Sequence, residues 1–134
     1  MFIKIKTTKT FTDITDKIEI PKGFNGTVNI FSKHTTAGIR ILENEKLLLA
    51  DYERILQKFA PKDAFYAHNI IDARDVSPEE RINGHSHIRT LFFPTSETIP
   101  VRDGEMMIGR WQRVFLVELD PAREREIIVT LIKQ

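Results

Sequence analysis

The sequence predicts a single α+β domain in which a mostly antiparallel β-sheet is accompanied by two helices. The chain has 134 residues, which suits one domain with its own core. Several short segments show the alternating or β-branched pattern of strands, and two segments repeat apolar residues at the helical period. Two helices among about seven strands indicate the α+β class, with residues 1–134 as one domain.

The N-terminal part is expected to form mainly strands. Residues 2–6 (FIKIK) alternate apolar and polar side chains, which is the period of a strand. Residues 12–21 (TDITDKIEIP) fit either a short helix or a strand. Residues 26–34 (GTVNIFSKH) are rich in β-formers, and residues 37–42 (AGIRIL) are expected to form the next strand.

The clearest helix covers residues 45–61 (EKLLLADYERILQKFAP), and its Pro61 marks the end. Apolar residues recur at i, i+4, i+7, i+8 and i+11, which gives one apolar face. These residues are Leu48, Tyr52, Ile55, Leu56 and Phe59. Residues 64–68 (AFYAH) are a short strand candidate. Residues 69–84 form a polar connection, and connections of this length are often functional in a compact domain.

The C-terminal third is expected to be β-structure. Residues 97–101 and 105–120 flank the dipeptide Asp103-Gly104, which is typical of a hairpin turn. Residues 125–132 (REIIVTLI) are nearly all apolar, which predicts a central strand.

Composition and charge exclude several classes of function. The formal net charge is +1 and no run of Lys or Arg occurs, so no nucleic-acid partner is expected. The chain has no cysteine, which excludes disulfides and thiolate chemistry and leaves His and carboxylates as metal ligands. No segment resembles a signal peptide or a membrane span, so we expect a cytoplasmic protein with no membrane partner.

Two of the four histidines, His85 and His87, lie one residue apart in the segment 83–93 (NGHSHIRTLFF). On a strand they would share a face and could chelate a metal, whereas on a helix they diverge by about 200°. Three apolar residues at i, i+3 and i+4, followed by Pro94, indicate a helix. Only one of the two histidines should therefore point toward a site.

The other histidines, His34 and His68, each close an apolar, strand-like run. Together with His87 they would resemble a three-histidine metal site with a fourth position open to water or phosphate. Alternatively, each histidine caps a strand or bonds a backbone carbonyl. Residues 34–38 (HTTAG) could hold an oxyanion through backbone N–H groups, or form an ordinary turn.

Four further residues allow a structural or a functional interpretation. Either Glu43 or Asn44 could cap the helix that follows. Trp111 is expected in the core unless a ligand uses it. Glu118 lies in an apolar run, where a carboxylate must be paired, metal-bound or at an edge because unpaired burial is costly.

Several motifs, taken in order, resemble the YjbQ-type family, known as secondary thiamine-phosphate synthases. The motifs are HTTAGIRILENE (34–45), YAHN (66–69), NGHSHIR (83–89), IPVRDG (99–104) and GRWQRVFLVELD (109–120). The resemblance implies a YjbQ-like α+β domain that assembles as a homotrimer with sites near subunit boundaries. It also implies weak thiamine-phosphate synthase activity, in which a pyrimidine diphosphate is joined to a thiazole phosphate and pyrophosphate is released.

The resemblance also implies roles for individual residues. The family's characteristic histidines fall on His34, His68 and His87 as metal ligands, while His85 lies where other members carry a different residue. The implied catalytic residues are His34, Glu43, Trp111, Gln112 and Glu118. The implied residues for binding a substrate or anion are Thr35, Thr36, Asn44, Arg110 and Arg123.

Two departures from the family pattern bear on the substrate and one mismatch bears on the metal. The common GTWQ reads GRWQ, with Arg110 in place of a Thr, and DGPR reads DPAR, which keeps Arg123 without the glycine. An added Arg can change which anion is preferred. Three imidazoles suit Zn²⁺ or another transition metal, whereas Mg²⁺, expected for the synthase reaction, prefers oxygen ligands.

Three functions are therefore considered. The first is a transferase that acts on phosphorylated heterocycles. The second is a non-catalytic trimer that binds a metal or a small phosphorylated metabolite. The third is a metal-assisted hydrolase of a phosphorylated compound. Tight binding without turnover would favour the second, and chelator-sensitive release of phosphate would favour the third.

Overall fold

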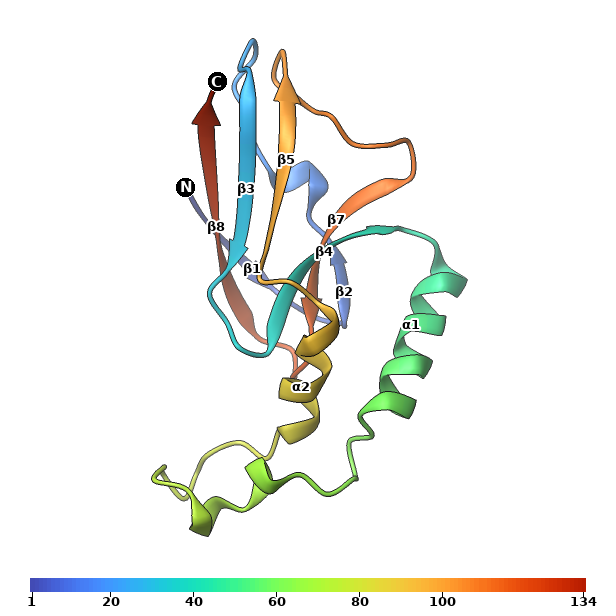
Figure 1. Ribbon diagram of the computed structural model, residues 1–134, viewed down its shortest axis with the longest axis vertical. Coiled ribbons are helices and arrows are strands. Elements are labelled where there is room, and N and C mark those ends of the chain that lie inside the picture. The colour runs from blue at the N-terminus through green and yellow to red at the C-terminus, as the bar shows by residue number, and fades with distance from the viewer.

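Two antiparallel β-sheets pack face to face in the computed structural model, which describes residues 1–134, and helices cover one side and one end (Figure 1). The five-stranded sheet has the order β1-β8-β3-β5-β6 and the three-stranded sheet has the order β2-β7-β4. The first sheet consists of β1 (Phe2–Lys6), β3 (Gly26–Ser32), β5 (Ser96–Arg102), β6 (Glu105–Met106) and β8 (Glu124–Lys133). The second consists of β2 (Phe11–Asp13), β4 (Ala37–Glu43) and β7 (Gln112–Glu118). The α+β class is confirmed, and the strands divide between two sheets rather than one.

The main core lies between the two sheets and follows the alternation of the strands. In β3, Val28 and Ile30 point inward and are buried, whereas Phe31 points outward and is 37% exposed. In β8, which lies between β1 and β3 as expected of a central strand, Ile127 and Val129 join the same core. Burial of such side chains is worth about 1.5–3 kcal/mol each.

The three-stranded sheet is covered on both faces, which explains the unbroken apolar run of β7. Val114 and Leu116 pack between the sheets, and Phe115 and Val117 pack on the other side against the helix α1 (Lys46–Phe59). A central strand with two covered faces reads as a continuous apolar run instead of an alternating one.

Helix α1 packs through only part of its predicted apolar face. Leu56 is buried, but Ile55 and Phe59 are each 48% exposed. The Glu45 side chain caps the helix by accepting the Leu48 N–H at 2.5 Å. The expectation that residue 43 or 44 supplies the cap is therefore wrong.

The segment between α1 and α2 (Gly84–Arg89) corrects one predicted strand. Residues 64–68 form no strand; instead Ala67–Asn69 form the 3-10 helix η2, and η3 (Ile71–Ala73) follows. The reason is contact with α2, because the Gly84 N–H donates to Asn69 Oδ1 at 2.9 Å and a Cβ on Gly84 would approach Tyr66 Cβ to 2.5 Å. The second predicted helix is confirmed as α2 followed by η4 (Thr90–Phe92).

One turn and one 3-10 helix complete the fold. Asp103 and Gly104, with φ of 52° and 85°, form the expected turn between β5 and β6. That hairpin is short, because the chain then crosses to the second sheet as β7. The ambiguous segment 12–21 forms the end of β2 and the 3-10 helix η1 (Thr15–Lys17), without a second strand. No helix of the chain combines the length and apolar character needed to cross a membrane.

Candidate functional site

His34 lies where β3 leaves the five-stranded sheet. The last β3–β8 pair is Ser32 with Ile127. Beyond this pair, the side chain of His34 takes over the hydrogen bonding to the β8 backbone. His34 Nε2 lies 3.0 Å from the backbone N and 3.1 Å from the backbone O of Glu126. Burial first, and the charge of Arg125 second, lower the pKa of His34, which favours a neutral ring that accepts the Glu126 N–H.

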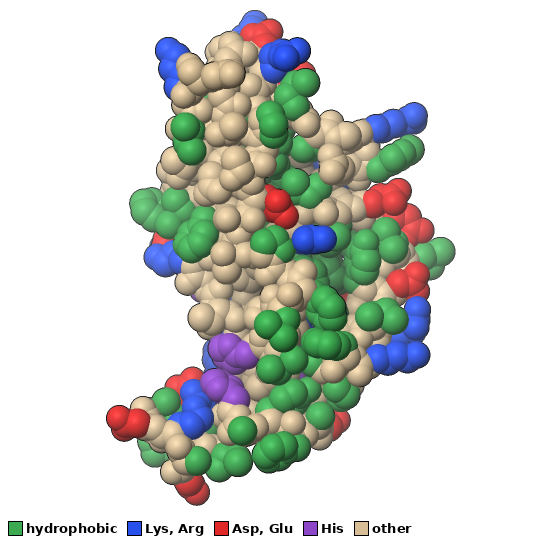
Figure 2. Space-filling view, viewed as in Figure 1, with side chains coloured by type: hydrophobic (Ala, Val, Ile, Leu, Met, Phe, Trp, Pro, Cys, Tyr) green, Lys and Arg blue, Asp and Glu red, His purple; other side chains and the backbone are tan.

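The rings of His68 and His87 adjoin where η2 meets α2, with 4.5 Å between their centroids and a tilt of 60° between their planes. Burial, and then the charge of His68, lower the pKa of His87. His85 is 8% exposed and its ring instead lies 3.4 Å from Ser86 Oγ. The helix therefore separates His85 from His87, as the spacing predicted, and histidine side chains reach the surface beside the segment that joins α1 and α2 (Figure 2).

A cavity of about 310 Å³ lies next to His34 and His87. It is lined by His34, Thr35, Ala37, Gly38, His87, Thr90, Phe93 and Thr95. The fold thus brings two of the predicted histidines and one of the predicted threonines to one cavity. Hydroxyl and imidazole groups can donate hydrogen bonds to a bound anion without carrying a charge.

The three predicted metal ligands do not form a ligand set within one chain. No group of three or more His, Cys, Asp or Glu side chains is placed to hold a metal ion. His34 Nε2 accepts the backbone N–H of Glu126, and the rings of His68 and His87 pack against each other at a tilt of 60°. The positions of these three histidines in one chain therefore do not fit a three-histidine metal site. Metal binding by His34, His68 and His87 stays a prediction.

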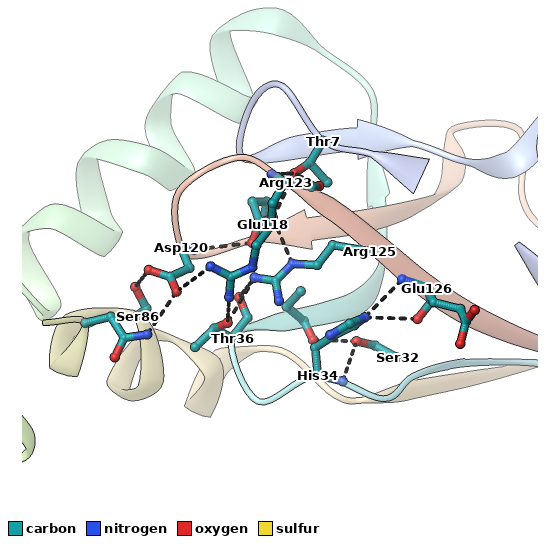
Figure 3. A network of polar contacts seen from close by, with 12 residues as sticks. Thr7, Ser32, His34, Thr36, Ser86, Glu118, Asp120, Arg123, Arg125 and Glu126 are labelled. Carbon is teal, nitrogen blue, oxygen red and sulfur yellow. Dashed lines mark hydrogen bonds and ion pairs between the residues drawn. The ribbon is translucent and has the colours of Figure 1, made fainter. Parts of the chain in front are cut away.

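A buried ion pair belongs to the same polar network region as His34 (Figure 3). Glu118 and Arg125 have side chains that are each 2% exposed, and two guanidinium nitrogens contact the two carboxylate oxygens, with Nε 2.8 Å from Oε1. Thr7 Oγ1 donates to Glu118 Oε1 at 2.8 Å, and Arg125 Nη2 donates to Thr36 Oγ1 at 2.9 Å. Glu118 is therefore paired, as its apolar surroundings required.

A second ion pair adjoins the first through Thr36. Arg123 donates to Thr36 Oγ1 at 3.2 Å, and its Nη1 lies 3.1 Å from Asp120 Oδ2. Asp120 also accepts from Asn83 at 2.9 Å and Ser86 at 3.2 Å. Burial works to raise the pKa of Asp120, but Asn83, Arg123 and Ser86 outweigh it and lower that pKa. The guanidinium groups of Arg123 and Arg125 are thus each paired with a carboxylate.

Sequence reasoning missed Arg125 and Asp120. The sequence held one signal for Arg125. It lies two residues before Ile127 and four before Val129, so it shares their inward face of β8. An inward arginine needs a buried carboxylate, and Glu118 was already noted as one. No comparable signal marked Asp120.

The remaining predicted residues lie at the far end of the three-stranded sheet. β4 and β7 pair from Ala37–Glu118 at the histidine end to Glu43–Gln112 at the other. Six residue steps separate these ends by about 20 Å. Glu43, Asn44, Arg110 and Trp111 surround a second hollow there, and Trp111 is 62% exposed, so its expected place in the core is wrong.

The fold and these two regions define a class: an α+β domain of paired antiparallel sheets with a polar, histidine-lined cavity at one end. The sequence profile of the UPF0047 YjbQ-like family matches residues 1–134. This chain belongs to that family.

Individual relatives agree with this assignment. A UPF0047 protein of Methanothermobacter thermautotrophicus is 43% identical over 107 residues, covering 80% of this chain and 68% of the relative. The UPF0047 protein YjbQ of Salmonella typhimurium is 33% identical and covers 89% of this chain and 83% of its own. The crystal structure of a protein of unknown function from Sulfolobus solfataricus, described as YbjQ-like, has a TM-score of 0.84 at 33% identity, covering 100% of this chain and 96% of that one.

Proposed function

We propose that the cavity beside His34 and His87 binds the phosphate groups of a small phosphorylated metabolite. The observation that carries this proposal is the lining itself, which combines two imidazoles with the hydroxyls of Thr35 and Thr95, whereas the Thr90 hydroxyl already donates to the His87 carbonyl. Its volume of about 310 Å³ is at the lower end of the range for small-ligand sites. Neutral hydrogen-bond donors suit phosphate oxygens where the nearby cations are already paired.

The reaction we propose for this cavity is the thiamine-phosphate synthase type. The bond between the pyrimidine unit and its diphosphate breaks, the electron pair leaves with pyrophosphate, and a new bond joins the pyrimidine unit to the thiazole phosphate. The cavity would hold the departing pyrophosphate and donate hydrogen bonds to its growing charge. His87, whose pKa is lowered, supplies one N–H donor while it remains neutral. Mg²⁺ would enter as part of the diphosphate substrate, because it prefers oxygen ligands.

Self-association into a trimer is part of the proposal. Apolar side chains lie exposed where α1 meets η4, including Ile55 and Phe59 at 48% and Phe92 at 46%, and hydrophobic surface gathers over this part of the molecule (Figure 2). Exposed apolar patches of this kind mark association surfaces. In addition, no small substrate can span the roughly 20 Å between the two ends of β4. One reaction can use both groups of residues only if they come from different subunits.

Mixed trimers test the activity and the shared site together. Wild-type protein should form thiamine phosphate, and His87→Ala and Trp111→Ala should each reduce product formation by at least about tenfold. Trimers assembled from equal amounts of both variants should recover about one quarter of wild-type activity, because a cyclic arrangement restores some complete sites.

The matched control mixes His87→Ala with His34→Ala, which both remove an imidazole from the same cavity, so no mixed trimer should contain a complete site. Light scattering should give three times the subunit mass for every sample. A monomer mass would contradict the trimer. A trimer without recovery would contradict the shared site, and wild-type trimer without product would contradict the synthase activity.

One observation favours binding without turnover as a second candidate. Glu118 is neutralised by Arg125 and bonded to Thr7, so this carboxylate is not free to act as a base in the chain as it stands. Saturable binding of pyrophosphate, measured by calorimetry on protein that makes no product, would support this candidate. Release of phosphate that stops on adding a chelator would instead support the metal-assisted hydrolase.

A further inference from the structure

The second hollow lies where β4 ends, α1 begins and the chain turns into β7. It has a volume of about 270 Å³ and is lined by Glu43, Asn44, Glu45, Arg110, Trp111 and Arg113. The turn that presents it is fixed, because the Gly109 N–H donates to Gln112 Oε1 at 2.7 Å and the Gln112 N–H donates to Gly109 O at 3.0 Å. The hollow is therefore a formed feature of the single chain.

Trp111 forms an aromatic wall of this hollow. Its side chain is 62% exposed, although a tryptophan is costly to leave in water. The Arg110 guanidinium lies over the ring, with Cζ 4.6 Å from the centroid. The indole thus already accepts a flat cation on its face, the arrangement in which a ring quadrupole attracts positive charge.

A rigid polar frame stands on the other side of the hollow. Arg113 donates to Asp13 Oδ2 at 2.7 Å and to Asp16 Oδ2 at 3.0 Å, and Asn44 donates to Asp13 Oδ2 at 3.1 Å. Burial works to raise the pKa of Asp13, but hydrogen bonds from Arg113 and Thr15 outweigh it and keep the carboxylate ionised. Both hydrogen-bonding ends of Arg113 are therefore occupied by carboxylates.

Four carboxylates, those of Glu43, Glu45, Asp13 and Asp16, stand against the two guanidinium groups of Arg110 and Arg113 in and beside the hollow. Arg113 offsets only one of its two aspartates, and Glu45 adds a carboxylate at the start of α1. Glu43 takes part in no ion pair. Arg110 is the only guanidinium here without a carboxylate partner, and it lies on Trp111. Carboxylates beside an open aromatic face are the features that recognise a cationic ring.

We propose that this hollow binds a flat aromatic cation, stacked on Trp111 where the Arg110 guanidinium now lies, with Glu43 as its counter-charge. The inference deepens the proposed function and rests on it for the use of the hollow in catalysis. It reverses the role that Arg110 suggests by itself, because Arg110 competes with the cation for the ring instead of attracting an anion.

A matched pair of small probes tests the charge preference on the intact protein. 1-Methylnicotinamide, which is methylated on the ring nitrogen, is a flat cation, and nicotinamide is its neutral counterpart of similar size. Trp111 is the only tryptophan, so its fluorescence reports on this hollow alone. Saturable quenching at unchanged lifetime should show the cation bound about fivefold more tightly, the factor expected for about 1 kcal/mol of cation–π attraction.

Two variants separate this proposal from an anion site. Glu43→Gln should reduce the preference to less than about twofold, and Arg110→Ala should strengthen binding of the cation about two- to threefold by freeing the ring. Arg81→Ala, which removes an exposed positive charge from the connection before α2, is the control and should change nothing.

Each result decides the proposal. Equal binding of the two probes, or weaker binding of the cation to Arg110→Ala, would overturn it. If wild-type protein makes thiamine phosphate but binds the two probes equally, the cation site is contradicted and the proposed function is not. If wild-type protein prefers the cation but makes no thiamine phosphate, the synthase activity is contradicted and the cation site is supported.

Discussion

Replacing Glu118 by Gln tests whether the buried ion pair between β7 and β8 stabilises the packing of the two sheets. Both Glu118 and Arg125 have side chains that are 2% exposed, so the substitution leaves a buried guanidinium without its carboxylate. An ion pair at about 4 Å is worth about 4 kcal/mol in surroundings of intermediate polarity. Breaking a buried pair from one side typically costs about 3–5 kcal/mol.

We therefore expect Glu118→Gln to lower the free energy of unfolding by about 3–5 kcal/mol, a large part of the roughly 5–15 kcal/mol of a typical domain. The new amide also places N–H donors where Arg125 and Thr7 donate, which adds to the loss. Urea unfolding followed by circular dichroism at one fixed subunit concentration measures the change.

A double variant and a surface control sharpen this experiment. Adding Arg125→Met to Glu118→Gln removes the orphaned charge, so the double variant should be more stable than Glu118→Gln alone. Asp51→Asn breaks the exposed pair with Arg54 and should cost no more than about 0.5 kcal/mol. A loss below about 1 kcal/mol for Glu118→Gln would refute the reasoning, because the pair could not then be both desolvated and structural.

Three other outcomes are expected. Gly84→Ala places a Cβ 2.5 Å from Tyr66 Cβ, so it should cost about 1–3 kcal/mol in urea unfolding and weaken pyrophosphate binding by displacing the adjoining rings of His68 and His87. His87→Ala should reduce pyrophosphate affinity in calorimetry far more than His85→Ala, which should mainly lower the melting temperature; equal losses of affinity would contradict this assignment. Burial is the first cause that lowers the pKa of His34, His85 and His87 below 6.5 in the folded chain. The unfolded chain therefore binds protons first as the pH falls, and the urea midpoint should decrease between pH 7.5 and pH values below about 6.5. A urea midpoint that stays constant over this pH range would contradict the prediction.

The sequence by itself determined the elements that depend on local patterns. The helical period located α1 and α2 and separated His87 from His85, and the apolar run of residues 125–132 predicted a central strand. Each of these predictions rests on spacing within about a dozen residues, the range over which backbone geometry fixes where a side chain points. The same reasoning failed for residues 64–68, where packing against Gly84 outweighs the tendency to form a strand.

Only the tertiary structure decided which distant residues meet. The strands separate into two sheets, and the pairing of β4 with β7 places Glu118 at one end and Gln112 at the other. The residues that the sequence assigned to one catalytic site therefore lie in two separate regions of the chain. The pairing of Glu118 with Arg125 and of His34 with the Glu126 backbone likewise depends on the register of β8. The physical reason is that strand pairing and register are fixed by contacts between residues far apart along the chain, which no local period encodes.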